Sequence, residues 1–324
     1  MPVTISDVAR AAGVSKSTVS RVLNTGAEVD VATAARVREV IAGLGYVPRS
    51  GAVGLARGSS RTIGMFTPSL TWPWMGEVLQ GVADTVEAAG YGMLLHTSGG
   101  GPRSMAHFTA QVSARAFDGL LVIVPEDSLG AVTEMRRRGM PVVLIDDHGH
   151  PRPGLPHVAT TNRAGGAAAA ARLLASGRRR PLVITGPPRF GCVRERLDGF
   201  ASVLPASLVL DGEFTEETGR RAVERALAQG VAFDAVFAHN DLIAAGALRA
   251  LRASGRAVPD DVAVVGFDDL PMARHTEPAL TTVRQPMREM GRAAARLLLS
   301  GLGGAALPDE PLVIPTELVV RDSA

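Results

Sequence analysis

Two series of short, nearly continuous apolar runs fill most of the chain after Thr62, and they limit its fold more than any other feature. Apolar runs of this length are typical of parallel strands that are buried on both faces. Amphipathic stretches with helical spacing separate them, at about 75–90, 104–116 and 129–138 in the first series. The runs are TIGMFTPS, MLLHTS, GLLVIVP and PVVLIDD, followed by PLVITG, LVLDG, AVFAHND and VAVVGFDD. We therefore predict an α/β core of two lobes, each built on a doubly wound parallel sheet.

Polar side chains follow several of the predicted strands. Ligands of doubly wound sheets bind outside the carboxyl ends of the strands. The polar residues at these ends are Asp146 and Asp147, His239, Asn240 and Asp241, and Asp268 and Asp269. Two lobes that face each other with such strand ends would form a binding site for a small polar molecule.

The N-terminal residues follow a helical pattern instead. Gly13 interrupts a first helical segment, Ser15 is a good N-cap for a second, and Asp30 can cap a third. A helix, a short glycine turn and another helix are the signature of a helix-turn-helix. The residues predicted to face inward are Ile5, Val8, Ala9, Ala12, Val19, Val22, Leu23, Val37, Val40, Ile41 and Leu44.

Charge and composition add further limits. Residues 1–60 carry seven basic and four acidic side chains, a charge of +3, whereas the whole chain has +2. A basic head on a near-neutral body suggests that the head meets a polyanion. With one cysteine, no signal peptide and no apolar run long enough to span a bilayer, we expect a soluble cytoplasmic protein. The sequence holds no catalytic or metal-binding motif, so we expect neither an enzyme nor a cofactor.

Several stretches together resemble the lactose-repressor (LacI/GalR) family of bacterial transcription regulators. They are TISDVARAAGVSKSTVSRVLN, YVP, HND and VVGFDDLPMARHTEPALTTVRQP, and the resemblance covers essentially the whole chain. It implies a core similar to periplasmic sugar-binding proteins, with discontinuous lobes joined by three crossovers near 158–161, 281–285 and 312–316. The implied divisions are a helix-turn-helix domain at 1–47, a hinge at 48–60 and a core at 61–324. Within the core, the N-lobe is about 61–157 and 284–311, and the C-lobe about 158–283 and 312–324.

The second predicted helix has an outward face suited to reading DNA. Lys16, Ser17, Ser20 and Arg21 lie opposite its apolar residues, as on a recognition helix in the major groove. Arg21 suits bidentate contact with guanine. The resemblance implies that Lys16 and Ser17 select the operator, and that further residues contact or brace the DNA: Thr4, Ile5, Ser20, Arg21, Asn24, Thr33 and Tyr46.

The segment at 46–61, YVPRSGAVGLARGSSR, is rich in Pro, Gly and Ser and indicates a linker, although its apolar residues could line a short helix. The resemblance implies that Ala52 packs in the minor groove and that Leu55 wedges a base step open. This sequence departs from the family pattern with Gly51, Gly54 and Arg49.

The resemblance also assigns residues to an effector cleft. Vicinal hydroxyls need paired donors and acceptors, and an arginine, an amide and carboxylates supply both. The residues that match effector positions, or lie beside them, are Trp72, Trp74, Asp146, Arg196, Phe214, Asn240 and Asp268. Phe190 and Cys192 replace small polar or charged groups and make the cleft drier.

We therefore predict a homodimeric transcription regulator, a repressor, whose binding to a palindromic operator is controlled by a small polar effector, a sugar or sugar derivative. The half-sites would lie one helical turn apart, ~34–36 Å. No leucine heptads follow ELVVRDSA, so we expect a dimer rather than a tetramer. The alternatives are a nucleoside or protein corepressor as effector, or a transporter solute-binding protein. The helix-turn-helix argues against the transporter alternative.

Overall fold

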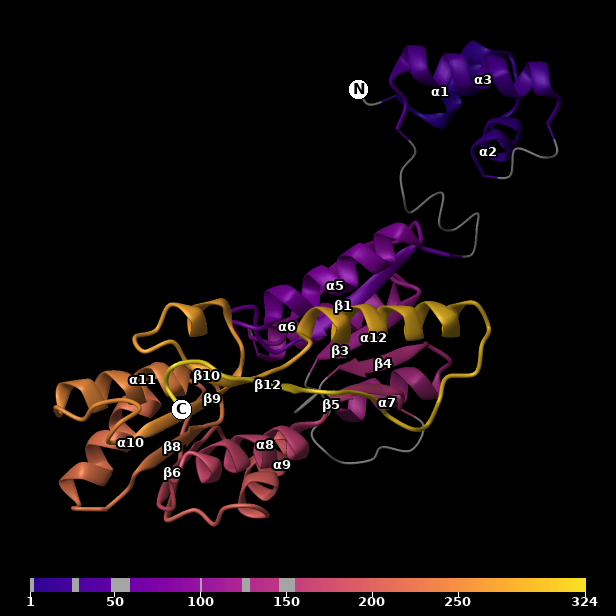
Figure 1. The fold of residues 1–324 in the computed structure, drawn as a ribbon. Coiled ribbons are helices and arrows are strands. Elements are labelled where there is room, and N and C mark those ends of the chain that lie inside the picture. The colour runs from indigo at the N-terminus through magenta and orange to yellow at the C-terminus, as the bar shows by residue number, and fades with distance from the viewer. Residues whose placement is uncertain (1–2, 25–28, 48–58, 100, 124–128, 146–154) are drawn as a thin grey trace.

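The computed structural model describes residues 3–24, 29–47, 59–99, 101–123, 129–145 and 155–324. They form a helical head and two α/β lobes (Figure 1). Ala52, Leu55 and Asp146, which were predicted to bind DNA or effector, lie outside the described residues. No helix within the described ranges has both the length and the apolar character needed to cross a membrane.

The head contains the three predicted helices, α1 (Ile5–Ala12), α2 (Lys16–Asn24) and α3 (Val31–Leu44). Gly13 ends α1 with a left-handed φ of 64°, a conformation that favours glycine. The hydroxyl of Ser15 accepts a hydrogen bond from the amide of Thr18 (3.1 Å), and Asp30 caps α3 in the same way at the amide of Thr33 (3.0 Å). The prediction for Leu44 was wrong, because its side chain is 40% exposed beyond the apolar cluster of the head.

The first lobe is a six-stranded sheet in the order β11-β5-β4-β3-β1-β2. Apolar clusters cover both of its faces, one with α5 and α12 and the other with α6 and α7. The elements are β1 (Thr62–Thr67), α5 (Met75–Ala88), β2 (Gly92–Thr97), α6 (Pro102–Ser113), β3 (Gly119–Ile123), α7 (Leu129–Arg137), β4 (Val142–Ile145), β5 (His157–Thr160), α12 (Met287–Leu302) and β11 (Leu312–Ile314).

The second lobe repeats this order as β12-β10-β9-β8-β6-β7. Its faces are covered by α8 with α9 and by α10 with α11. The elements are α8 (Asn162–Ala175), β6 (Pro181–Thr185), α9 (Gly191–Ala201), β7 (Leu208–Asp211), α10 (Glu216–Ala228), β8 (Ala235–Ala238), α11 (Asp241–Ala253), β9 (Ala263–Asp268), η1 (Pro271–Arg274), β10 (Thr281–Arg284) and β12 (Glu317–Val319). The prediction of two doubly wound lobes is confirmed.

The chain passes between the sheets three times: from β5 to α8, from β10 to α12 and from β11 to β12. The strands β5 and β11 both run toward the second lobe, so they pair in parallel. The strand β12 runs away from the first lobe whereas β10 runs toward it, so these two pair antiparallel. Hydrogen bonds tie the crossings together. Thr160 Oγ1 donates to Gln285 Oε1 (2.8 Å), and the amide of Thr316 donates to Thr161 Oγ1 (2.8 Å).

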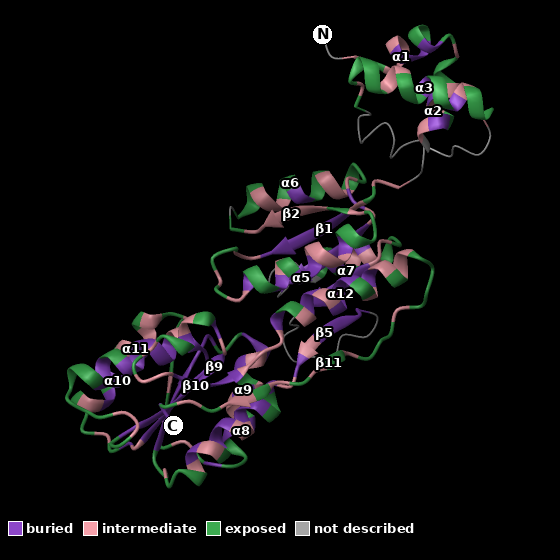
Figure 2. Ribbon diagram, turned by 45° about the horizontal axis from the view of Figure 1, so that its top comes forward, coloured by how far each residue is buried: buried purple, intermediate pink, exposed green. Residues whose placement is uncertain are grey.

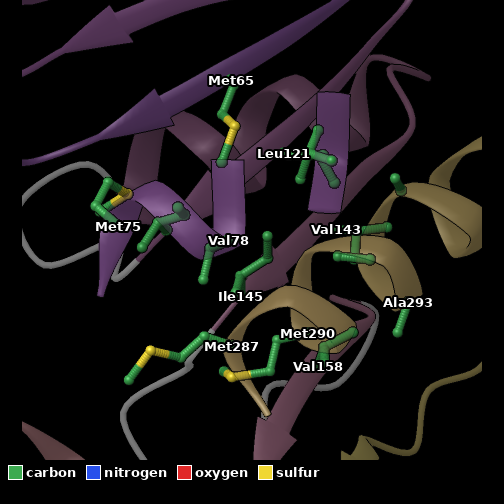
Figure 3. Packing of buried hydrophobic residues seen from close by; sticks show 14 of the residues in the cluster. Met65, Met75, Val78, Leu121, Val143, Ile145, Val158, Met287, Met290 and Ala293 are labelled. Atoms are coloured by element: carbon green, nitrogen blue, oxygen red, sulfur yellow. The ribbon is translucent and has the colours of Figure 1, made fainter. Parts of the chain in front are cut away.

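Burial follows this layering. Figure 2 shows buried strands in both lobes and helices that alternate between buried and exposed residues. Figure 3 shows the core of the first lobe, where Met65 and Leu121 of the sheet and Val78 of α5 lie with Met290 and Ala293 of α12. The helix α12, which follows the second crossing, is therefore an integral part of the first lobe.

Three of the helix pairs meet at reciprocal glycines. A Cβ added to Gly81 of α5 would lie 2.1 Å from the carbonyl oxygen of Arg288 in α12, and one on Gly166 of α8 would lie 2.1 Å from that of Arg196 in α9. Contacts this close leave no room for a side chain. The reciprocal pairs are Gly81 and Gly291, Gly166 and Gly199, and Gly219 and Gly246.

Candidate functional site

The outward face of α2 presents the side chains predicted to read DNA. Val19 and Val22 are buried in the head, whereas Lys16, Ser17 and Arg21 are exposed and Ser20 is half-buried. Asn24 lies in the last turn of the same helix. A short exposed helix with polar and basic residues on one face is suited to insertion in a major groove.

The other predicted head residues belong to α1 and α3 or directly flank them. Thr4 is exposed and donates from both its hydroxyl (2.6 Å) and its amide (3.0 Å) to Asp7 Oδ2 at the start of α1. Thr33 donates to Asp30 Oδ2 (3.2 Å). Ile5 and Tyr46 are half-buried and pack against the apolar cluster of the head.

A pocket between the two lobes brings together six of the seven residues predicted for the effector cleft. They are Trp72, Trp74, Arg196, Phe214, Asn240 and Asp268. The same pocket is lined by Pro73, Phe190, Cys192, Gln285, Met287 and Met290. The sequence analysis did not predict Pro73, Gln285, Met287 or Met290. Gln285 lies at a crossing between the lobes, and the two methionines have the spacing of ordinary core residues on α12.

Arg196 is 3% exposed, and four neighbouring groups hold it in place. Its Nε donates to Asn162 Oδ1 (2.9 Å), and its Nη1 donates to the backbone carbonyl of His239 (2.6 Å). Its Nη2 lies 3.9 Å from Asp268 Oδ1, and its guanidinium carbon lies 3.7 Å from the centre of the Phe267 ring. A buried arginine fixed in this way is preorganised to donate to a ligand.

Asp268 stands at the end of β9 on an unusual backbone. Its φ is 113° and that of Asp269 is 57°, a left-handed region that non-glycine residues rarely adopt. Burial raises the pKa of Asp268 to about 6, although Arg196 and a hydrogen bond from Gln285 Nε2 (2.7 Å) both act to lower it. Backbone strain beside a buried carboxylate in a pocket is typical of a binding site.

Asn240 lines the pocket, and His239 lies buried next to it in the chain. The side-chain oxygen of Asn240 accepts from the amide of Ile243 (2.8 Å) and caps α11, so its amide nitrogen is the group that can donate to a ligand. His239 is fully buried, and both of its ring nitrogens lack a hydrogen-bond partner. Burial, followed by the nearby Arg196, holds the pKa of His239 well below its ordinary value.

The apolar part of the pocket is aromatic. The rings of Trp72 and Trp74 stack with centroids 5.7 Å apart, and Phe190 meets Trp72 edge-on at 6.3 Å. Phe214 lies 5.8 Å from Phe190 and fits over the end of β6 because Gly186 has no side chain there. Among the described residues, no group of three or more histidine, cysteine, aspartate or glutamate side chains could hold a metal ion.

Two family profiles match the chain. The profile of bacterial regulatory proteins, lacI family, matches residues 4–49, and the profile of the periplasmic binding protein-like domain matches residues 170–324. The HTH-type transcriptional regulator CelR of Thermobifida fusca is 35% identical over 333 residues, which cover 99% of this chain and 98% of the relative.

Solved structures agree with these matches. A complex of the transcriptional regulator CelR with cellobiose superimposes with a TM-score of 0.75 at 35% identity, over 99% of this chain and 100% of that one. The lac repressor dimer bound to operator and the anti-inducer ONPF superimposes with a TM-score of 0.90 at 26% identity, over 100% of this chain and 99% of that one.

Proposed function

Since the chain belongs to the lacI family of bacterial regulatory proteins and is a DNA-binding transcriptional regulator, we propose that the pocket between its lobes binds the effector that controls operator binding. One observation carries this proposal. Arg196, Asn240 and Asp268 come from three different elements of the second lobe and line one pocket with residues of the first lobe. Together they offer donors and acceptors to a molecule rich in hydroxyl groups.

The effector that we propose is a sugar or a sugar derivative. The CelR structure is named as a complex with cellobiose, and aromatic rings beside hydrogen-bonding groups suit the two faces of a pyranose. The protein would act as a repressor that dimerises, as the lac repressor does in its operator complex, and it would bind a palindromic operator. We also propose a cytoplasmic location, because the operator DNA lies there.

We further propose the domain divisions that the family pattern implies, with the crossings between β5 and α8, β10 and α12, and β11 and β12 as their boundaries in the core. In the head, Lys16 and Ser17 would select the operator. The residues proposed to contact or brace the DNA are Thr4, Ile5, Ser20, Arg21, Asn24, Thr33, Tyr46, Ala52 and Leu55.

The test of the pocket is Arg196→Ala, with Arg194→Ala as the control, because Arg194 is an exposed arginine of the same helix. A thermal-shift screen of sugars and nucleosides first identifies a ligand. We expect the ratio of operator affinities with and without that ligand to fall to one in Arg196→Ala, and circular dichroism checks that the variant is folded. A normal ratio in this variant would refute the pocket, and a nucleoside as the best ligand would favour the alternative effector.

The test of the head replaces Lys16 and Ser17 together by alanine. Both side chains are exposed, so we expect the head to remain folded. Selection of bound sequences from a random DNA library should then yield a changed operator preference, because each lost base contact is worth about 1–3 kcal/mol of discrimination. An unchanged preference would contradict the assignment of these two residues.

A further inference from the structure

A cluster of hydrogen bonds outside the pocket holds the chain where it enters the first lobe from the head. Its centre is Asp118, the residue directly before β3. Asp118 Oδ1 accepts from the amide (2.7 Å) and the hydroxyl (2.9 Å) of Ser60. Asp118 Oδ2 accepts from the hydroxyl of Ser59 (2.5 Å) and the amide of Arg61 (2.9 Å). One carboxylate therefore binds three consecutive residues, 59–61, which we call the entry segment.

The backbone of the entry segment is shaped around this carboxylate. Arg61 has a φ of 50°, in the left-handed region that non-glycine residues rarely adopt. Consecutive amides in such a turn form a concave site for an anion, and here the amides of Ser60 and Arg61 both donate to Asp118. A strained residue persists only where its surroundings determine its conformation. The carboxylate of Asp118 is thus the group that fixes the entry segment.

This carboxylate keeps its charge. Burial acts to raise the pKa of Asp118, but the hydrogen bonds from Ser59, Ser60 and Arg61 outweigh it and lower this pKa. Asp118 is therefore ionised at neutral pH. Hydrogen bonds to an ionised acceptor are roughly twice as strong as those between neutral groups, so the entry segment is held firmly.

Further contacts tie the entry segment to both neighbours of β1 in the sheet. On the β3 side, the amide of Asp118 donates to the carbonyl of Thr62 (2.8 Å), and on the β2 side the amide of Gly92 donates to the carbonyl of Arg61 (2.8 Å). The guanidinium carbon of Arg61 lies 5.1 Å from the centre of the Tyr91 ring, just before β2. The entry segment is therefore built into the sheet of the first lobe, and the chain leaves the lobe toward the head at its first residue.

We propose that Asp118 is a positioning residue for operator recognition, because its carboxylate fixes the place and direction in which the chain leaves the first lobe toward the head. This inference rests on the proposed function, in which two heads of a dimer bind the two half-sites of a palindrome. Once one head is bound, the other binds at an effective concentration set by how its connection is held. A fixed exit favours one half-site spacing, whereas a released entry segment has to be ordered again when the operator binds.

The experiment compares Asp118→Ala with Glu87→Ala in the full-length protein. Glu87 is an exposed carboxylate on α5 of the same lobe, so the control loses the same charge. Affinity is measured for the palindrome selected from a random DNA library and for DNA that keeps one half-site and has the other scrambled. We expect Asp118→Ala to weaken binding to the palindrome on the order of tenfold, the cost of ordering one residue, and to leave half-site binding unchanged. Glu87→Ala should change neither.

Altered half-site spacing gives a readout that a merely structural role would not move. A single base pair inserted at the centre of the palindrome displaces and rotates one half-site relative to the other. We expect this insertion to weaken binding by the unchanged protein more than binding by Asp118→Ala, because a released entry segment adapts to the new position.

A second variant covers the case in which Asp118→Ala misfolds, as judged by urea unfolding. The double variant Ser59→Ala with Ser60→Ala removes both hydroxyl donors and retains the amide hydrogen bonds to Asp118. It should show the same two changes to a smaller extent.

The outcomes separate this inference from the proposed function. Full palindrome affinity and an unchanged spacing preference in Asp118→Ala, or in the double variant that replaces it, would overturn the inference. An equal loss on the palindrome and the half-site would assign Asp118 to the general stability of the lobe and would overturn it too. If the unchanged protein binds the palindrome no more tightly than the half-site, the proposed binding of a palindrome by a dimer fails, and the inference fails with it.

Discussion

The two lobes repeat one strand order, yet they contribute different chemistry to the pocket that lies between them. Among the described residues, the first lobe supplies Trp72, Pro73 and Trp74 before α5, and Met287 and Met290 from α12. The second lobe supplies every charged group of the described lining. A shared fold therefore fixes where the pocket lies, and the residues at strand and helix ends decide what it binds.

The two lobes also offer a buried and an exposed carboxylate for comparison. In the second lobe, the side chain of Asp269 is 2% exposed and pairs with Arg284 (2.7 Å) and Arg321 (2.6 Å), which lie in different segments of the chain. In the first lobe, Glu134 is 38% exposed and pairs with Arg137 and Arg138, its neighbours along the chain, both at 2.7 Å. Buried ion pairs that bridge elements constrain a fold, whereas exposed local pairs contribute little.

The largest expected effect is the difference between Asp269→Asn and Glu134→Gln. Burial acts to raise the pKa of Asp269, but hydrogen bonds from Arg284 and Arg321 outweigh it and lower this pKa. Removing the buried carboxylate should reduce the free energy of unfolding by about 3 kcal/mol, because it leaves the charge of Arg321 without its carboxylate partner. Glu134→Gln should cause no change that urea unfolding can resolve. Equal effects would contradict the distinction between these two carboxylates.

The next largest effects are expected for Gly166→Ala in the second lobe and Gly81→Ala in the first. Both variants should lower the free energy of unfolding by similar amounts. Each new Cβ would lie 2.1 Å from a backbone oxygen, and overpacking of this kind costs about 1–3 kcal/mol. Gly76→Ala on α5 is the control, since no atom lies near its added Cβ and alanine favours a helix.

Ligand binding should separate the two glycine variants. The Cβ of Gly166→Ala would press on the backbone of Arg196, so this variant should weaken ligand binding more than Gly81→Ala does. Calorimetry with the ligand found by screening measures the difference. The reverse order would show that the first lobe dominates recognition.

A pH dependence that belongs to the second lobe is the last expected effect. The pKa of Asp268 is raised from 3.8 to about 6, so the folded state holds this proton more tightly than the unfolded state does. Its contribution to stability is therefore present at low pH and is lost as pH rises from about 4 to 6, by at most about 1.4 kcal/mol per pH unit. Asp268→Asn should remove this component. Urea unfolding measured at several pH values should therefore show that the free energy of unfolding falls less steeply between pH 4 and 6 in the variant than in the unchanged protein. Parallel pH profiles would rule it out.

Much of the fold could be predicted from the sequence because buried strands leave long apolar runs. The eight predicted runs contain β1, β3, β4 and β6–β9, and all of β2 except Gly92. The strands at the crossings could not be found in this way. In β11, Leu312 and Val313 are 44% and 47% exposed, and the apolar run of this edge strand, LVI, is too short to reveal it. The three crossings themselves came only from the family pattern.

The pocket was predictable to a different degree. Asn240 and Asp268 stand where strands end, and such positions are visible in the sequence, whereas Arg196 in the middle of α9 was assigned only from the family pattern. Met287 and Met290 were not, because they reach the pocket only through the second crossing, which brings α12 back to the first lobe. Gln285 was missed for the same reason, although it connects Asp268 to Thr160 by hydrogen bonds.

The reciprocal glycines restrict how the molecule can move. At each glycine the backbones of the two paired helices touch directly. If one helix slid along its partner, side chains of the adjacent turns would collide with backbone carbonyl groups. Shear within the three pairs α5–α12, α8–α9 and α10–α11 is therefore blocked, and each lobe has to turn as a rigid body. Any closure around a ligand then comes from rotation of a few backbone bonds at the three crossings.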